Sequence, residues 1–109
     1  MTNLFLPSNY QDPVPKLDLL AVAAHPTALE QTAGGTMIKM AELGYRTGAL
    51  DLSPGDMTLG TKPEEVFAQA TAAMPKLLLK WRGNLHYPDG RLDNSLPGRM
   101  TIAGEIRRL

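Results

Sequence analysis

The sequence contains no cysteine, which excludes disulfide bonds, thiolate chemistry and cysteine-ligated zinc. It also lacks an excess of either charge: 11 basic and 11 acidic residues cancel, so no overall field favours nucleic acid or an anionic membrane. No segment approaches the roughly 20 apolar residues of a membrane span. The first 15 residues have neither the basic start nor the apolar core of a signal peptide. We therefore expect a cytoplasmic protein that binds neither nucleic acid nor membranes.

The chain has 109 residues, which is the size of one small domain. Residues 1–15 contain Pro7, Pro13 and Pro15, which oppose regular structure, so we expect an N-terminal arm there. Residues 16–109 are expected to form the folded domain. Because this part is short, it can bury one modest core.

Apolar runs of strand length alternate with helical patterns in residues 16–109. Strands are expected at 17–24, 46–53 and within 77–85, and helices at 34–44, 61–74 and 99–109. The first helix is expected to open at Gly34 and Gly35. The second is expected to have Thr61 as its N-cap, and Pro75 should end or kink it. The order β-α-β-α-β-α predicts an α/β fold with three layers around a parallel sheet.

Several motifs occur in a specific order: "LDLLAVAAHP", then "GGTMIKMAELGYRTGALDLSPGD", then "NLHYPDGRL". Together they resemble the N-terminal half of the LmbE/PIG-L family, and most of all the deacetylases of bacillithiol biosynthesis. The resemblance covers roughly residues 16–109. It implies a Rossmann-like half-domain with strand order 3-2-1, truncated relative to the family.

The resemblance also implies a zinc site at the end of the first strand, where the family has His-Pro-Asp-Asp-x-Glu. His25 matches the first zinc ligand and Glu30 the final glutamate. Thr27 occupies the position of the general base and Ala28 that of a carboxylate ligand, while the family's downstream histidine ligand has no counterpart here. Zinc needs about three protein ligands and a base for its water. We therefore expect no zinc cofactor and no zinc-dependent deacetylase activity.

Other polar residues follow the strands and are expected at the carboxyl edge of the sheet, where open α/β folds bind ligands. His25, Glu30 and His86 are the candidate catalytic residues, and Asp56 and Asp89 are candidate substrate-binding residues. The alternative function is an engineered or evolved fragment whose cleft performs hydrolase-type acid/base chemistry or binds a ligand. The opposing interpretation is that these are solvated loop residues.

Two further signals are weak. The glycines of "AGGTM" can offer backbone N–H groups to an anion if they open the helix, although tight packing explains them equally well. Asp51 follows the second strand as the ribose-binding acid of dinucleotide folds does, but the glycine fingerprint is missing.

In the order 3-2-1, the first strand lies at an edge of the sheet, and an exposed apolar edge is poorly tolerated by a monomer. We therefore expect a homodimer, formed either through antiparallel pairing of the first strand with its copy or through the N-terminal arm.

Overall fold

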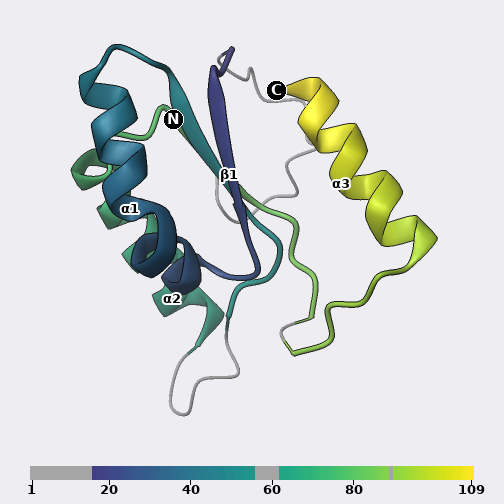
Figure 1. Ribbon diagram of the computed structural model, residues 1–109. Coiled ribbons are helices and arrows are strands. Elements are labelled where there is room, and N and C mark those ends of the chain that lie inside the picture. Colours follow the sequence, from purple (N-terminus) through teal and green to yellow (C-terminus); the bar gives the residue numbers. More distant parts are fainter. Residues whose placement is uncertain (1–15, 56–61, 89) are drawn as a thin grey trace.

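The computed structural model describes residues 16–55, 62–88 and 90–109, so the expected arm at 1–15 lies outside the described residues. The described residues form a three-layer α/β fold (Figure 1). Its elements are β1 (Leu19–Ala23), α1 (Pro26–Glu42), β2 (Thr47–Asp51), α2 (Pro63–Lys76), β3 (Trp81–Asn84) and α3 (Leu96–Arg108). The predicted fold class and element order are confirmed. None of the described helices combines the length and the apolar character needed to cross a membrane.

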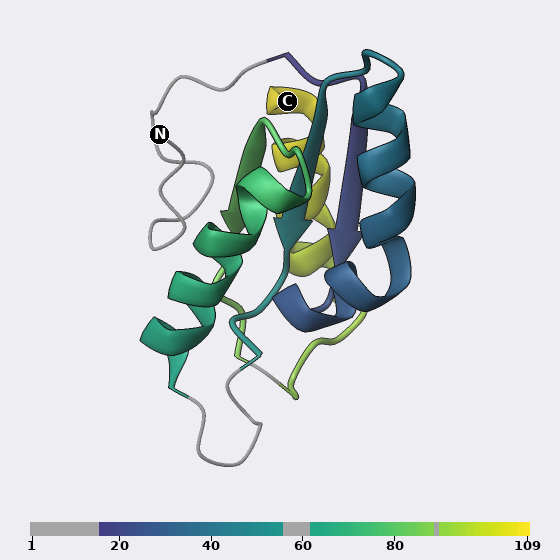
Figure 2. The ribbon, with the colours of Figure 1, turned by 90° about the vertical axis from the view of Figure 1, so that its left-hand side faces the viewer.

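The three strands form one parallel sheet in the order β1-β2-β3, as predicted. Leu19 of β1 is paired with Thr47 of β2, and Gly48 of β2 is paired with Trp81 of β3. Helices α1 and α2 cover one face of the sheet and α3 lies beside the other face (Figure 1). Viewed from the side of α1 and α2, β1 is the outermost strand on the right (Figure 2). The carboxyl ends of all three strands therefore meet at one edge.

The main core lies between the sheet and the two helices α1 and α2. Leu29 and Met37 of α1 pack with Ala49 of β2, and with Leu77 and Leu79 between α2 and β3. Every residue of β2 is buried, because this strand has a neighbour on each side and layers on both faces. Burial of each large aliphatic side chain contributes about 1.5–3 kcal/mol, so this cluster anchors α1 to the sheet.

Helix α1 begins at Pro26, eight residues before the predicted start at Gly34. His25 is its N-cap and Pro26 occupies its first turn, where the fixed φ of proline suits a helix. Gly34 instead lies in mid-helix and is buried, with Leu77 3.4 Å from where its Cβ would be. The prediction that these glycines open the helix and offer N–H groups to an anion is therefore wrong.

The other boundaries differ by a few residues. Helix α2 begins after Lys62 and continues through Pro75 to Lys76, and Leu78 (φ 59°) then reverses the chain toward β3. Thr61, the predicted N-cap, lies outside the described residues, and Lys62 takes that position. Helix α3 starts at Leu96 rather than residue 99, because the Ser95 hydroxyl oxygen accepts the Gly98 N–H at 3.2 Å and caps the helix.

Candidate functional site

Backbone hydrogen bonds join the segments that leave the three strands at the carboxyl edge. The Leu52 N–H donates to the Ala23 carbonyl at 2.9 Å, and the Ser53 N–H and hydroxyl donate to the Ala24 carbonyl at 2.9 and 2.8 Å. The Tyr87 N–H donates to the Leu52 carbonyl at 2.9 Å. The residues that follow β1, β2 and β3 are therefore held in fixed relative positions.

His25 stands at the start of α1 with extended backbone angles, and its Nδ1 accepts the Ala28 N–H at 3.4 Å. Its side chain also lies close to Gly55, where an added Cβ would come within 2.8 Å of the His25 Cβ. The φ of Gly55 is 72°, a conformation that favours glycine. His25 therefore acts in this structure as a helix cap packed beneath the segment that follows β2.

The carboxylate of the motif, Glu30, belongs to a buried ion network centred on Arg82. The Arg82 side chain is completely buried on β3, and its Nε donates to Asp51 Oδ2 at 2.8 Å. Its Nη1 lies 2.6 Å from Glu30 Oε1, as an ion pair whose alignment falls short of a hydrogen bond. Its Nη2 donates to the Pro26 carbonyl and to Asp51 Oδ1, at 3.3 and 3.4 Å. One guanidinium thus connects β2, β3 and the first turns of α1.

The electrostatics of this network follow from one cation lying between two carboxylates. Burial raises the pKa of Asp51 and the charge of Glu30 adds to this, although Arg82 opposes both effects. Burial alone would lower the pKa of Arg82, but Asp51 and Glu30 outweigh it and raise that pKa. Arg82 therefore stays charged, and Asp51 holds a proton more readily than an exposed aspartate.

Sequence reasoning missed Arg82 and gave Asp51 only a weak alternative role. A detectable signal was present: each is a charged residue at a position where the pattern predicts a buried strand, Arg82 in "LLLKWRGNL" and Asp51 after "TGAL". Buried charges are almost always paired, so two such residues on neighbouring strands indicate an ion pair.

The predicted site residues lie in different surroundings. Glu30 is bound to Arg82, and the side chain of Thr27 is exposed at the start of α1. His86 follows β3 with φ 60°, its N–H donates to Asn84 Oδ1 at 2.8 Å, and its ring lies 5.1 Å from that of Phe67 in α2. His25 caps α1, so the two histidines have separate contacts. Asp56 and Asp89 lie outside the described residues.

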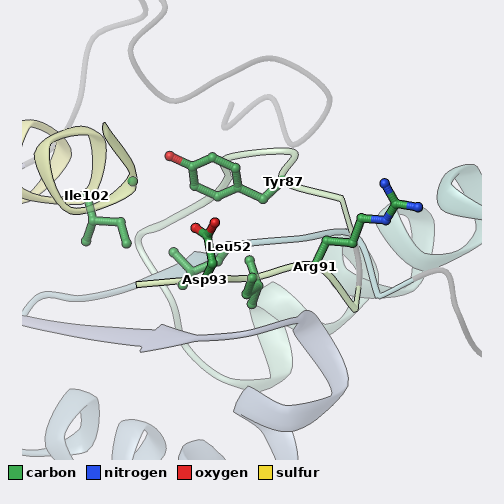
Figure 3. Close-up of a pocket in the computed structure, with 7 residues that line it drawn as sticks. Leu52, Tyr87, Arg91, Asp93 and Ile102 are labelled. Carbon is green, nitrogen blue, oxygen red and sulfur yellow. The ribbon is translucent and has the colours of Figure 1, made fainter. Parts of the chain in front are cut away.

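A small pocket of about 50 Å³ lies on the α3 side of the carboxyl edge (Figure 3). Leu52 and Ile102 contribute apolar walls, and Tyr87 and Asp93 contribute polar groups. Figure 3 shows the Asp93 carboxylate among these side chains and the Arg91 guanidinium directed away from them. One water needs about 10–15 Å³ of such space, so the pocket has room for a group of a few heavy atoms. It includes neither His25 nor His86.

The described residues around His25 do not form a set of zinc ligands. Among the residues that the structure describes, no group of three histidine, aspartate or glutamate side chains is placed to hold a metal. The Nδ1 of His25 is already an acceptor for the Ala28 N–H, and Glu30 faces a buried arginine.

The fold is that of a Rossmann-like α/β half-domain, and its carboxyl edge carries the candidate site. No protein-family model matches the chain, and no curated protein matches it. Solved structures do match. The conserved protein TT1542 from Thermus thermophilus is 41% identical with a TM-score of 0.80, and the match covers 85% of this chain and 42% of that one.

Two enzymes share the fold at lower identity. For the N,N'-diacetylchitobiose deacetylase of Pyrococcus horikoshii the TM-score is 0.72 and the identity 20%, over 83% of this chain and 36% of that one. For GalB, the 4-carboxy-2-hydroxymuconate hydratase of Pseudomonas putida, the TM-score is 0.68 and the identity 22%. The match covers 83% of this chain and 42% of GalB. The chain thus spans less than half the length of each of these proteins.

Proposed function

We propose that this chain is the first part of an LmbE/PIG-L domain that has lost its zinc-deacetylase chemistry. The 41% identity with TT1542 over most of this chain supports the family assignment, as does the fold shared with a deacetylase. The quoted motifs support it independently, since they occur in the family's order. The matched part of the chain, 83–85% of its residues, corresponds to less than half of each of these three structures.

One observation carries the proposal: at the start of α1, His25 and Glu30 are both engaged in structural contacts. His25 and Glu30 keep their places, but Glu30 neutralises Arg82 and His25 caps the helix. Between them, a hydroxyl and a methyl group replace the two carboxylates. Threonine does not accept a proton at neutral pH, and alanine cannot bind a metal. The site therefore retains a structural role and lacks both a base and a second ligand.

Metal analysis tests this proposal. The purified chain is incubated with zinc, dialysed and assayed for bound metal, and we expect well below one zinc per chain, unchanged in His25→Ala. The double variant Thr27→Asp/Ala28→Asp restores both carboxylates and should bind more zinc than the native chain. In parallel, N,N'-diacetylchitobiose with added zinc should release no acetate above the buffer rate. One zinc per native chain that is lost in His25→Ala would refute the proposal.

Acid/base catalysis by His25 and His86 remains the alternative that the sequence predicts. It requires both histidines in one reaction, whereas each has its own contacts in the structure. A panel of ester and amide substrates tests it with His25→Ala and His86→Ala. Activity that falls in both variants, while the circular dichroism spectrum is unchanged, would favour this alternative over loss of function.

The pocket beside α3 favours a second candidate function, the binding of a small ligand. Its apolar walls and the Asp93 carboxylate suit a small molecule with one polar group. A fragment panel followed by thermal unfolding measures such binding, because a ligand that binds the folded state raises the melting temperature. Ile102→Trp should abolish the shift by filling the pocket. Ile106→Trp, at a half-exposed position one turn further along α3, is the matched control.

A further inference from the structure

The pocket beside α3 is formed by three segments of the described chain. Its walls come from residues that follow β2 and β3 and from the first half of α3, and none of them belongs to β1 (Figure 3). The Tyr87 N–H donates to the Leu52 carbonyl at 2.9 Å, which joins two of these walls. The Ser95 hydroxyl caps α3 and so fixes where the third wall begins. The shape of the pocket therefore follows from contacts within the fold.

The charge of the pocket is set by one carboxylate. Asp93 lines it, and among the residues that the structure describes no ion pair involves this side chain. The Arg99 guanidinium donates instead to the Asn94 side chain and carbonyl, at 2.9 and 3.3 Å. The Arg91 guanidinium is directed away from the other lining side chains (Figure 3). The pocket therefore presents a negative charge that neither of these two cations neutralises.

The start of α3 offers little to an anion. Pro97, in the first turn, has no N–H. The N–H groups of Gly98 and Arg99 already donate to the hydroxyl and the carbonyl of Ser95, at 3.2 and 3.0 Å. Helix starts bind anions through N–H groups of this kind. Because these donors are missing or engaged and a carboxylate stands among the walls, the pocket favours a ligand that donates hydrogen bonds and carries positive charge.

The remaining walls and the volume define the rest of the ligand. Leu52, Leu92 and Ile102 are apolar, and the Tyr87 hydroxyl oxygen is a hydrogen-bond acceptor. This oxygen lies 4.0 Å from where a Cβ of Gly98 would be, so a side chain at that position would narrow the space beside it. The volume of about 50 Å³ has room for roughly three to five heavy atoms, since one water needs about 10–15 Å³. A short alkyl chain with one donor group fits these walls.

We propose that this pocket binds a small primary amine as its ammonium ion, with the alkyl chain against Leu52 and Ile102 and the ammonium group at the Asp93 carboxylate and the Tyr87 hydroxyl. An ammonium group has three donors and no acceptor, which matches these two oxygen-bearing groups. Asp93 is exposed, so water screens the pair and the affinity should be on the order of millimolar. The inference rests on the ligand-binding candidate function and is independent of the loss of zinc chemistry.

Three ligands with the same alkyl chain and different end groups test the proposal by NMR titration of the full chain. n-Butylammonium should shift the amide signals of Leu52, Tyr87 and Ile102 in a saturable way, and should bind about threefold or more tightly than n-butanol. Butyrate should shift none of these signals. Equal or tighter binding of n-butanol or butyrate would overturn the proposal and leave ligand binding by the pocket intact. No saturable shift with any of the three would refute both.

Charge variants distinguish the pocket from a general attraction of amines to the protein surface. Asp93→Asn should weaken binding of n-butylammonium about threefold to fivefold, the upper part of the range for an exposed ion pair, and should leave that of n-butanol unchanged. Arg91→Gln is the matched control, because its guanidinium is directed away from the pocket (Figure 3), and it should bind n-butylammonium no more weakly than the native chain. Ile102→Trp should abolish binding of both ligands. Unchanged binding of n-butylammonium by Asp93→Asn would overturn the proposal.

Discussion

Replacing Arg82 with methionine should destabilise the fold by about 3–5 kcal/mol at neutral pH, the cost of leaving a buried charge without its partner. The Asp51 side chain is 1% exposed, so water cannot compensate for the lost guanidinium. The Glu30 side chain is 33% exposed and reaches solvent, so leaving Glu30 without Arg82 destabilises the fold less than leaving Asp51 without it. The variant also frees the Pro26 carbonyl, which accepts from Arg82 at 3.3 Å.

Urea denaturation followed by circular dichroism measures this change, since the free energy of unfolding falls linearly with urea concentration. A domain of this size has about 5–15 kcal/mol of stability in total, so the variant should remain measurable only if the native chain is in the upper part of this range. Glu30→Gln removes the charge of the partly exposed partner alone and should cost about 1 kcal/mol or less, which makes it the matched control. The double variant Arg82→Met/Asp51→Leu should recover part of the loss, because an apolar pair carries no unpaired charge.

The pH dependence gives a sharper criterion. Burial raises the pKa of Asp51, and without Arg82 that pKa should rise further. A carboxyl whose pKa is higher in the folded state destabilises the fold above that pKa, and the penalty vanishes below the pKa of the unfolded chain. The loss in Arg82→Met should therefore be largest near neutral pH and should shrink as the pH approaches about 4. A loss below about 1 kcal/mol, or one independent of pH, would refute the ion network as described.

Three further predictions concern single positions. Gly35→Ala should stabilise the protein by about 0.5–1 kcal/mol in urea denaturation, because the residue is mid-helix with open space at its Cβ; destabilisation would contradict the early start of α1. Gly55→Ala should cost about 1–3 kcal/mol, since its φ is 72° and the new Cβ would lie 2.8 Å from the His25 Cβ; an unchanged melting temperature would argue against that contact. The pKa of Asp18 should lie below its ordinary value because Arg46 donates hydrogen bonds to it. Any stabilisation from this pair is therefore lost as the pH falls through that lowered pKa. In an NMR titration, Arg46→Gln should raise the pKa of Asp18.

The fold was largely predictable from the sequence, because it depends on periodic burial. For the strand in "LDLLAVAA" and for the helix beginning near Glu64, the residues of the segment itself are enough to predict its secondary structure. The start of α1 was missed because the helix propensity of Gly34 and Gly35 is poor, whereas capping by His25 and packing on Leu77 decide the outcome. Helix boundaries of this kind depend on tertiary contacts that a linear pattern does not contain.

The candidate site was less predictable, because its central residue acts through partners distant in the sequence. Arg82 is 31 residues from Asp51 and 56 from Pro26, and only the folded sheet brings them together. Glu30 was predicted as a catalytic candidate from its place in a motif, while its contact with Arg82 shows what the side chain does in this structure. The motif marks Glu30 in the sequence, whereas its ion pair with Arg82 follows only from the folded sheet.

The ion network also indicates which substitutions at the start of α1 the fold tolerates. A substitution at Thr27, which is exposed, or at Ala28, which is partly exposed, costs the fold little, since surface changes usually lie within about 0.5 kcal/mol. A substitution at Asp51 leaves Arg82 with one carboxylate in place of two, and a change of Arg82 leaves Asp51 without a countercharge. Stability alone therefore retains the residues beneath the site while the residues that face solvent are free to change. The same fold occurs in a deacetylase and in a hydratase, so the activity of any such domain has to be established from those solvent-facing positions.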